Sequence, residues 1–189
     1  MMIFFGHVGI SLLVVFLITI ALKKGVDYRF VIVGSMLPDI IDKPLGEYLL
    51  NSVFHNGRIV GHTLVLIAIL AIIALLVAKR YQFWGIGVLT LGAFLHQLLD
   101  QMWNAPISWF WPAFGWEFPQ YQTDNYLLMI LNNLLNKPEV YVPELVGLVI
   151  IAAFIIRFKL YRPENARAFV MTGRLSVSSK VKPVAVIKQ

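Results

Sequence analysis

Four long runs of hydrophobic residues alternate with polar segments along the chain. Ile3–Leu22 and Ile59–Ala78 each contain 20 residues and no Lys, Arg, Asp or Glu. A helix of that length spans about 30 Å, the thickness of the hydrocarbon core of a bilayer. Trp84–Trp103 is equally long, and Val140–Ile156 forms the last run. The pattern therefore predicts four membrane-spanning helices.

A fifth hydrophobic run, Phe30–Ile41, has only 12 residues. This is short for a helix that faces lipid, so we expect a helix that is enclosed by the others or broken near Pro38. The predicted fold is all-α: a polytopic bundle of about four full transmembrane helices and one short or broken membrane helix. We expect this domain to cover residues 1–162, with a mobile, basic cytoplasmic tail at residues 163–189.

Two further segments are expected at the membrane surface. Trp103–Pro119 is rich in aromatic residues, which is typical of a segment at the membrane–water interface. Its residues Trp109, Trp111 and Trp116 are better explained as part of an interfacial belt than as a substrate clamp. Asp124–Asn136 has apolar residues at helical spacing, and predicts a surface helix with Asp124 as its N-cap.

Composition supports a membrane protein. The chain is 59% hydrophobic and 14% charged, with a mean hydropathy of +0.75, whereas soluble domains carry about 25% charged residues. Because cysteine is absent, any metal must be held by nitrogen and oxygen. Membrane topology explains the net charge of +6 better than a nucleic-acid partner does, so no nucleic acid is expected.

The basic residues also predict an orientation. The predicted helices place 13 of the 16 Lys and Arg residues on one side of the membrane, and leave Lys43, Arg58 and Lys137 on the other. Basic residues are enriched in cytoplasmic segments. We therefore expect a multi-pass protein of the cytoplasmic membrane with its N-terminus outside and its C-terminus in the cytoplasm.

Six ionisable residues interrupt or border the hydrophobic runs. They are His7, Asp39, Asp42, His62, His96 and Asp100. Ionisable side chains inside a membrane are costly unless they are paired or bind a ligand, so they indicate a functional site. Counted from the predicted cytoplasmic ends, all but Asp42 lie about 14 to 24 Å above the inner edge of the membrane. The sequence thus predicts one polar layer in the outer half.

Imidazole and carboxylate groups at one depth are the ligands of a divalent metal site. Each part of the set has a simpler alternative. His96 and Asp100 could form a buried hydrogen-bonded pair, and the carboxylates of Asp39 and Asp42 could cap a helix or pair with Lys43. A lone histidine in a helix is more often a hydrogen-bond donor between helices. The coincidence of depth is what favours a metal.

Arg58 is a further candidate beside this layer. It follows an Asn-Gly turn and lies close in sequence to His62, so it could hold an anionic substrate or a phosphoryl oxygen. The alternative is an interfacial arginine that meets lipid headgroups. His55 flanks the same turn but lies outside the membrane layer.

Several short motifs occur together in one order. They are Gly6-His7, Gly34–Pro44 (GSMLPDIIDKP), Gly57–Thr63 (GRIVGHT), Gly92–Asp100 (GAFLHQLLD) and Trp111-Pro112. This ordered set resembles the bacterial and archaeal family of membrane-bound metal-dependent hydrolases, which includes the LexA-binding inner-membrane hydrolases. That family is similar in ligand order to zinc-dependent phospholipase C. The resemblance implies five metal ligands, namely His7, Asp39, His62, His96 and Asp100. Asp100 would be a candidate bridge between two ions.

The leading hypothesis is a membrane-embedded metal-dependent hydrolase that acts on a phosphoester or lipid-derived substrate. Asp39, Asp42 and Arg58 are its candidate catalytic residues. One or two ions are expected, with zinc favoured over manganese, nickel or iron. Membrane lipids are expected partners, and the tail could bind a cytoplasmic partner.

Two alternatives stay open. A metal-ion transporter would use the same ligands transiently, although the inner halves of the first and third runs offer it few polar residues. A non-catalytic membrane scaffold would keep the polar network for stability alone.

Overall fold

The computed structural model describes residues 2–120 and 126–175, and within these ranges the regular elements are all helices. This confirms the predicted all-α class. In chain order the elements are α1 (Phe5–Leu22), α2 (Tyr28–Lys43), η1 (Pro44–Leu49), α3 (Asn51–Phe54), η2 (Val60–His62), α4 (Leu64–Tyr81), α5 (Gly85–Leu99), η3 (Met102–Asn104), α6 (Pro106–Trp109), α7 (Tyr126–Asn136), α8 (Pro138–Arg157) and α9 (Pro163–Thr172).

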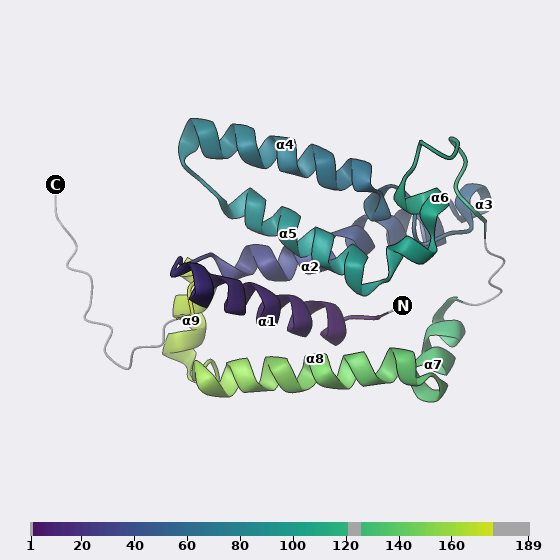
Figure 1. Cartoon of the computed structure of the whole chain (residues 1–189). Helices are drawn as coiled ribbons and strands as arrows, with labels where there is room; N and C mark the ends of the chain where they lie inside the picture. Colours follow the sequence, from purple (N-terminus) through teal and green to yellow (C-terminus); the bar gives the residue numbers. More distant parts are fainter. Residues whose placement is uncertain (1, 121–125, 176–189) are drawn as a thin grey trace.

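The five longest helices lie side by side in the order α4, α5, α2, α1 and α8 (Figure 1). The helix α2 is in the middle of this row, packed against α1 on one side and α5 on the other. Of the two expectations for the short run, the enclosed helix is the one observed, because α2 continues past Pro38 to Lys43. A helix enclosed by protein can be shorter and more polar than one that faces lipid.

The helices α2 and α5 cross at a very short distance. A Cβ atom on Gly34 would collide with the backbone of Leu89, and one on Gly92 would lie 2.9 Å from the backbone nitrogen of Ser35. Small residues at both positions therefore let the two backbones touch. This contact brings the backbone of Ser35 beside the C-terminal half of α5, where His96 lies.

Three helices of the described chain are long and apolar enough to cross a membrane, namely α1, α4 and α8. The prediction of about four full spans is not confirmed, because α5 has only 15 residues. After Leu99 the chain leaves the helix, and Gln101 adopts a left-handed conformation with φ of 54°. The run Trp84–Trp103 is thus continuous in hydrophobicity but not in helical structure.

The run Ile59–Ala78 also differs from the expected single helix. Its first residues form the short turn η2, and α4 begins only at Leu64, where the Thr63 hydroxyl accepts a hydrogen bond from the backbone N–H of Leu66. The cause lies in α2, since the carboxylate of Asp42 binds backbone N–H groups in this segment.

The outward faces of the candidate membrane-spanning helices are apolar. On α4, exposed aliphatic side chains include Ile72, Leu75 and Leu76, and on α8 they include Val149 and Ile156. A soluble monomer seldom exposes so much contiguous apolar surface. These faces are suited to contact with lipid tails.

The segments outside the five-helix row are partly described. The helix α7 ends at Asn136 as predicted, whereas its predicted cap, Asp124, lies outside the described residues. The expected tail begins with α9, whose Phe169 packs against the core cluster of α1, α2 and α8. The remainder of that tail, residues 176–189, also lies outside the described part.

Candidate metal centre

The position of His62 is fixed by Asp42. One oxygen of the Asp42 carboxylate accepts hydrogen bonds from the backbone N–H groups of Ile59 and His62, and the other accepts from Gly61. The Nδ1 atom of His62 lies 2.7 Å from the same carboxylate. Because a carboxylate only accepts, Nδ1 carries the proton, and Nε2 of the neutral ring presents a lone pair.

His96 is held in the same way by a different group. Its Nδ1 lies 2.7 Å from the backbone carbonyl oxygen of Ser35, and this oxygen also can only accept. The close crossing at Gly34 and Gly92 brings that carbonyl within reach. His96 therefore also presents an Nε2 lone pair when its ring is neutral.

The two lone pairs face each other. Nε2 of His62 lies 3.2 Å from Nε2 of His96, and both side chains are fully buried. Two facing lone pairs repel unless a positive charge lies between them, either a proton on one ring or a metal ion. The arrangement is therefore one that a cation stabilises.

Asp39 completes this group from α2. Its Oδ1 lies 3.7 Å from Nε2 of His62 and 3.8 Å from Nε2 of His96. Its other oxygen, Oδ2, accepts a hydrogen bond from Lys43 at 2.6 Å. The sequence allows Lys43 to pair with either Asp39 or Asp42, and in the structure it pairs with Asp39. Asp39, His62 and His96 together form a cluster of the kind that holds a metal ion.

His7 and Asp100 lie directly beside this cluster. Nε2 of His7 is 3.4 Å from Oδ1 of Asp100, and the ring of His7 stacks on that of His96 at 3.8 Å and 16°. Lone pairs of nearly parallel rings do not converge on one point. The geometry therefore favours His7 and Asp100 as a second set of ligand atoms, although His7, His96 and Asp100 are also close enough to form a cluster of three.

The surroundings of His7 and Asp100 differ. Both ring nitrogens of His7 and the hydroxyl of Ser11 are buried, with no hydrogen-bond partner among the residues that the structure describes. Asp100, by contrast, accepts from the backbone N–H of Met2 at 3.0 Å and from the Arg58 guanidinium at 2.7 Å. The predicted candidate Arg58 thus contacts the predicted ligand Asp100.

The structure brings together every residue that the sequence nominated, but not in equivalent positions. Asp42 has both oxygens engaged by the backbone and by His62, so it orients His62, a candidate ligand, and does not face the cluster. His55 is absent from both sets of ligand atoms, as expected. The indole of Trp109 donates to the side chain of Gln97, so this tryptophan supports the centre in addition to any interfacial role.

Two supporting residues were not nominated from the sequence. The buried amide of Gln97 donates to the backbone carbonyls of Gly61 and Thr63, on both sides of His62. Glu144 of α8 accepts hydrogen bonds from four backbone N–H groups that precede His7, namely those of Ile3, Phe4, Phe5 and Gly6. Both are polar residues within hydrophobic runs, and this property could have identified them from the sequence.

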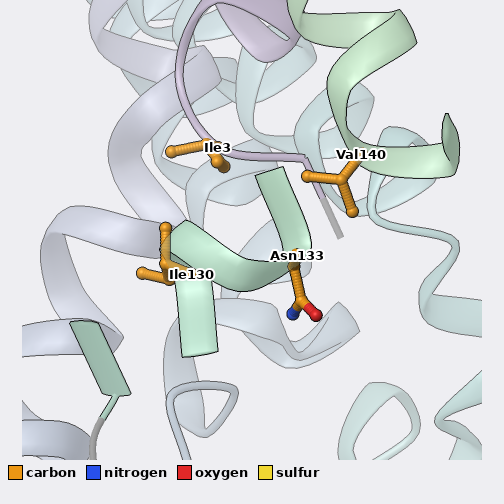
Figure 2. Close-up of a pocket in the computed structure, with 4 residues that line it drawn as sticks. All are labelled: Ile3, Ile130, Asn133 and Val140. Atoms are coloured by element: carbon orange, nitrogen blue, oxygen red, sulfur yellow. The ribbon is translucent and has the colours of Figure 1, made fainter. Parts of the chain in front are cut away.

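A small hollow lies apart from this centre. It is lined by Ile3, Ile130, Asn133 and Val140, between the N-terminal segment, α7 and α8 (Figure 2). None of the candidate ligands lines it, so it adds no polar group to the His/Asp centre.

Comparison with known proteins gives one match. The family model described as YdjM inner membrane protein matches residues 1–166, which includes every residue of the centre. No curated protein and no solved structure matches the chain.

Proposed function

This chain belongs to the YdjM inner membrane protein family, and we propose that it is a membrane-embedded, metal-dependent hydrolase. The observation that carries the proposal is the pair of buried imidazoles whose Nε2 atoms face each other at 3.2 Å. Both Nδ1 protons are already committed to acceptors, so the pair needs a cation, and a neighbouring carboxylate makes a metal ion the best candidate.

The spacing of the ligand atoms fits a metal. Two ligands of a tetrahedral zinc ion, with bonds of about 2.0 to 2.1 Å, lie about 3.4 Å apart. The distances from Nε2 of His62 to Nε2 of His96 and to Oδ1 of Asp39 are 3.2 and 3.7 Å. A slight separation of the two imidazoles and a slight inward movement of the carboxylate would therefore bring the three groups to this spacing. Zinc suits the imidazole and carboxylate donors, and manganese, nickel or iron are alternatives.

The residues divide the work of the site. His62, His96 and Asp39 hold the first ion, and His7 and Asp100 offer ligand atoms for a second. When bound, a divalent metal polarises the scissile bond and lowers the pKa of water. Asp42 and the Ser35 carbonyl keep the two Nε2 atoms directed inward, which is the usual role of groups behind histidine ligands. Arg58 is placed to stabilise negative charge next to Asp100.

Orientation is part of the proposal. The N-terminus would lie outside and the C-terminus inside, which places the centre toward the outer leaflet, as the Lys and Arg distribution predicts. A reporter fused to the C-terminus tests this directly. Reporter activity typical of the periplasm or cell exterior would reverse the face on which the site opens.

The activity is tested with detergent-purified protein that is first chelated and then reloaded with zinc or manganese. We expect hydrolysis of a phosphodiester or phospholipid substrate by the reloaded wild type and none by the chelated protein or by His62→Ala. His55→Ala is the matched control, because it removes a histidine outside the centre. Turnover that persists in His62→Ala would refute the proposed site.

A transporter makes a different prediction for the same protein. Metal flux into proteoliposomes without turnover of any substrate would favour it over the hydrolase. The inner parts of α1 and α4 argue against a conducting path, because Thr19 is the only residue with a hydroxyl or charged side chain in Val14–Leu22 and Leu70–Ala78.

A further inference from the structure

We infer that Lys43 and Arg58 form a cation pair that binds a phosphoryl group of the substrate. This inference rests on the proposed metal-dependent hydrolase and names the chemical class that its site recognises. The starting point is geometric. Lys43 binds Oδ2 of Asp39 at 2.6 Å and Arg58 binds Oδ2 of Asp100 at 2.7 Å, so each cation lies behind one carboxylate of the centre.

Of the charged groups of the centre, the two cations are the ones most exposed at the surface of the protein. The side chains of Lys43 and Arg58 are 22% and 28% exposed, whereas those of Asp39 and Asp100 are 7% and 3% exposed. Both histidines of the facing pair are fully buried. A molecule that approaches from outside therefore meets positive charge before it meets the imidazoles.

The cations compensate the buried carboxylates of Asp39 and Asp100, but they do not help the centre to retain a metal. Each one shares a carboxylate with a candidate metal position and repels a divalent ion, since like charges a few ångströms apart in a low-dielectric environment interact strongly. The bond from Lys43 leaves Oδ1 of Asp39 free to face the histidines. The cations are thus compatible with a metal and can have a second role.

The charge balance of the centre indicates this second role. Three carboxylates (Asp39, Asp42 and Asp100) and two cations leave the centre with a net charge of −1 when its histidines are neutral. One divalent ion changes this to +1, and a second ion makes it more positive. A buried centre with a positive net charge is stabilised by an anion. A phosphoryl group fits best, because its several oxygens can meet a metal, an ammonium and a planar guanidinium together.

Binding of inorganic phosphate to metal-loaded protein in detergent tests the inference. Isothermal titration calorimetry is carried out on wild type, Lys43→Gln, Arg58→Gln, the charge-conserving Lys43→Arg and Arg58→Lys, and the control Lys137→Gln. Lys137 precedes α8 and is a cation on the same predicted side of the membrane. We expect each Gln variant to bind phosphate at least about tenfold more weakly, the conservative variants to recover part of the loss, and the control to match wild type.

Metal content, measured on the same samples, separates the two hypotheses. We expect both Gln variants to retain their metal. Phosphate binding that is equal in the Gln variants and the control, while metal is bound, overturns the cation pair and leaves the metal centre standing. Absence of metal from the wild type overturns the proposed function itself.

A second series identifies where the phosphate comes from. Phosphatidic acid, phosphatidylcholine and inorganic phosphate are each tested as competitors of the phosphate that the metal-loaded protein has bound. Stronger displacement of bound phosphate by phosphatidic acid than by free phosphate indicates a lipid phosphate, and equal displacement by the two indicates a soluble one. Either result supports the cation pair if the displacement is lost in Arg58→Gln. Displacement that does not depend on Arg58 contradicts the cation pair.

Discussion

Two aspartate–arginine pairs at different places in the molecule show how the same chemistry serves different purposes. Asp27 and Arg29, just before and within the start of α2, form a pair whose side chains are 20% and 43% exposed. Asp100 and Arg58 form a pair in which the aspartate is only 3% exposed. Exposed pairs contribute little free energy, whereas a buried carboxylate must be compensated.

The difference lies in what else surrounds each carboxylate. Asp27 is paired with Arg29 through several hydrogen bonds. Arg29 also donates to the backbone carbonyls of Val170 and Met171, and so connects α9 to the start of α2. Around Asp100 there is a ring, His7, whose nitrogens have no hydrogen-bond partner within the described residues. The first pair is a structural clasp, and the second belongs to the His/Asp cluster that we propose binds a metal.

Removal of a ligand at the buried centre should have the largest effect. We expect His96→Ala to reduce bound zinc to background, because it deletes one of the facing Nε2 atoms and leaves Asp39 without a second histidine beside it. Metal analysis of purified protein measures this, with His55→Ala as the control. Full metal content in His96→Ala would show that the histidine is structural.

A change behind the ligand should have a smaller effect. In Asp42→Asn the ring of His62 loses its carboxylate partner at Nδ1, so the orientation and basicity of Nε2 both suffer. We expect metal affinity to fall about 10- to 100-fold while binding persists at high metal concentration. Competition with a chelator of known affinity gives the ratio. An unchanged affinity would mean that Asp42 serves only to fold the turn at η2.

Glu144 allows the stability of the same region to be tested apart from its ligands. The substitution Glu144→Gln removes the charge that accepts four backbone N–H groups before His7. We expect a destabilisation of about 1 to 3 kcal/mol, because charged acceptors in partly buried sites are costly to lose. Hydrogen exchange of residues 3–6 should accelerate first. Protection of these amides equal to that of wild type would contradict this role.

The exposed clasp should give the smallest effect. We expect Arg29→Gln to speed hydrogen exchange in α9 and to leave bound metal unchanged. The clasp also predicts a pH dependence. Hydrogen bonds from Arg29 lower the pKa of the Asp27 carboxyl below its ordinary value. The clasp is therefore intact above the ordinary aspartate pKa, and weakens only as the pH falls through the lowered one. Loosening of α9 near neutral pH would argue against it.

The hydrophobic pattern was sufficient to predict the helical class and the membrane, because the period and length of apolar runs are local properties of the chain. It predicted the ends of α1 and α7 but not the bounds of α4 and α5. Ile59–Ala78 and Trp84–Trp103 are continuous in hydrophobicity, but the carboxylate of Asp42 draws the start of one into a turn, and the other ends at Leu99. Such tertiary hydrogen bonds leave no trace in a hydropathy pattern.

The candidate ligands could be found because polar residues are rare in membrane helices, and the same logic extends to Gln97 and Glu144. Their roles could not be ranked from the sequence. Asp39 and Asp42 are three residues apart on one helix, yet one faces the histidines and the other holds the turn that carries His62. Only the packing of η2 against α2 distinguishes the candidate ligand, Asp39, from the residue that orients His62, which is Asp42.

The most direct measurement of the central claim is X-ray absorption spectroscopy at the zinc edge on purified, zinc-loaded protein. We expect nitrogen and oxygen ligands at about 2.0 to 2.1 Å, with the multiple scattering of at least two imidazoles. We also expect this imidazole signal to fall in His62→Ala and to be unchanged in His55→Ala. Zinc that is absent, or bound without imidazole, would contradict the claim that the facing histidines form a metal centre.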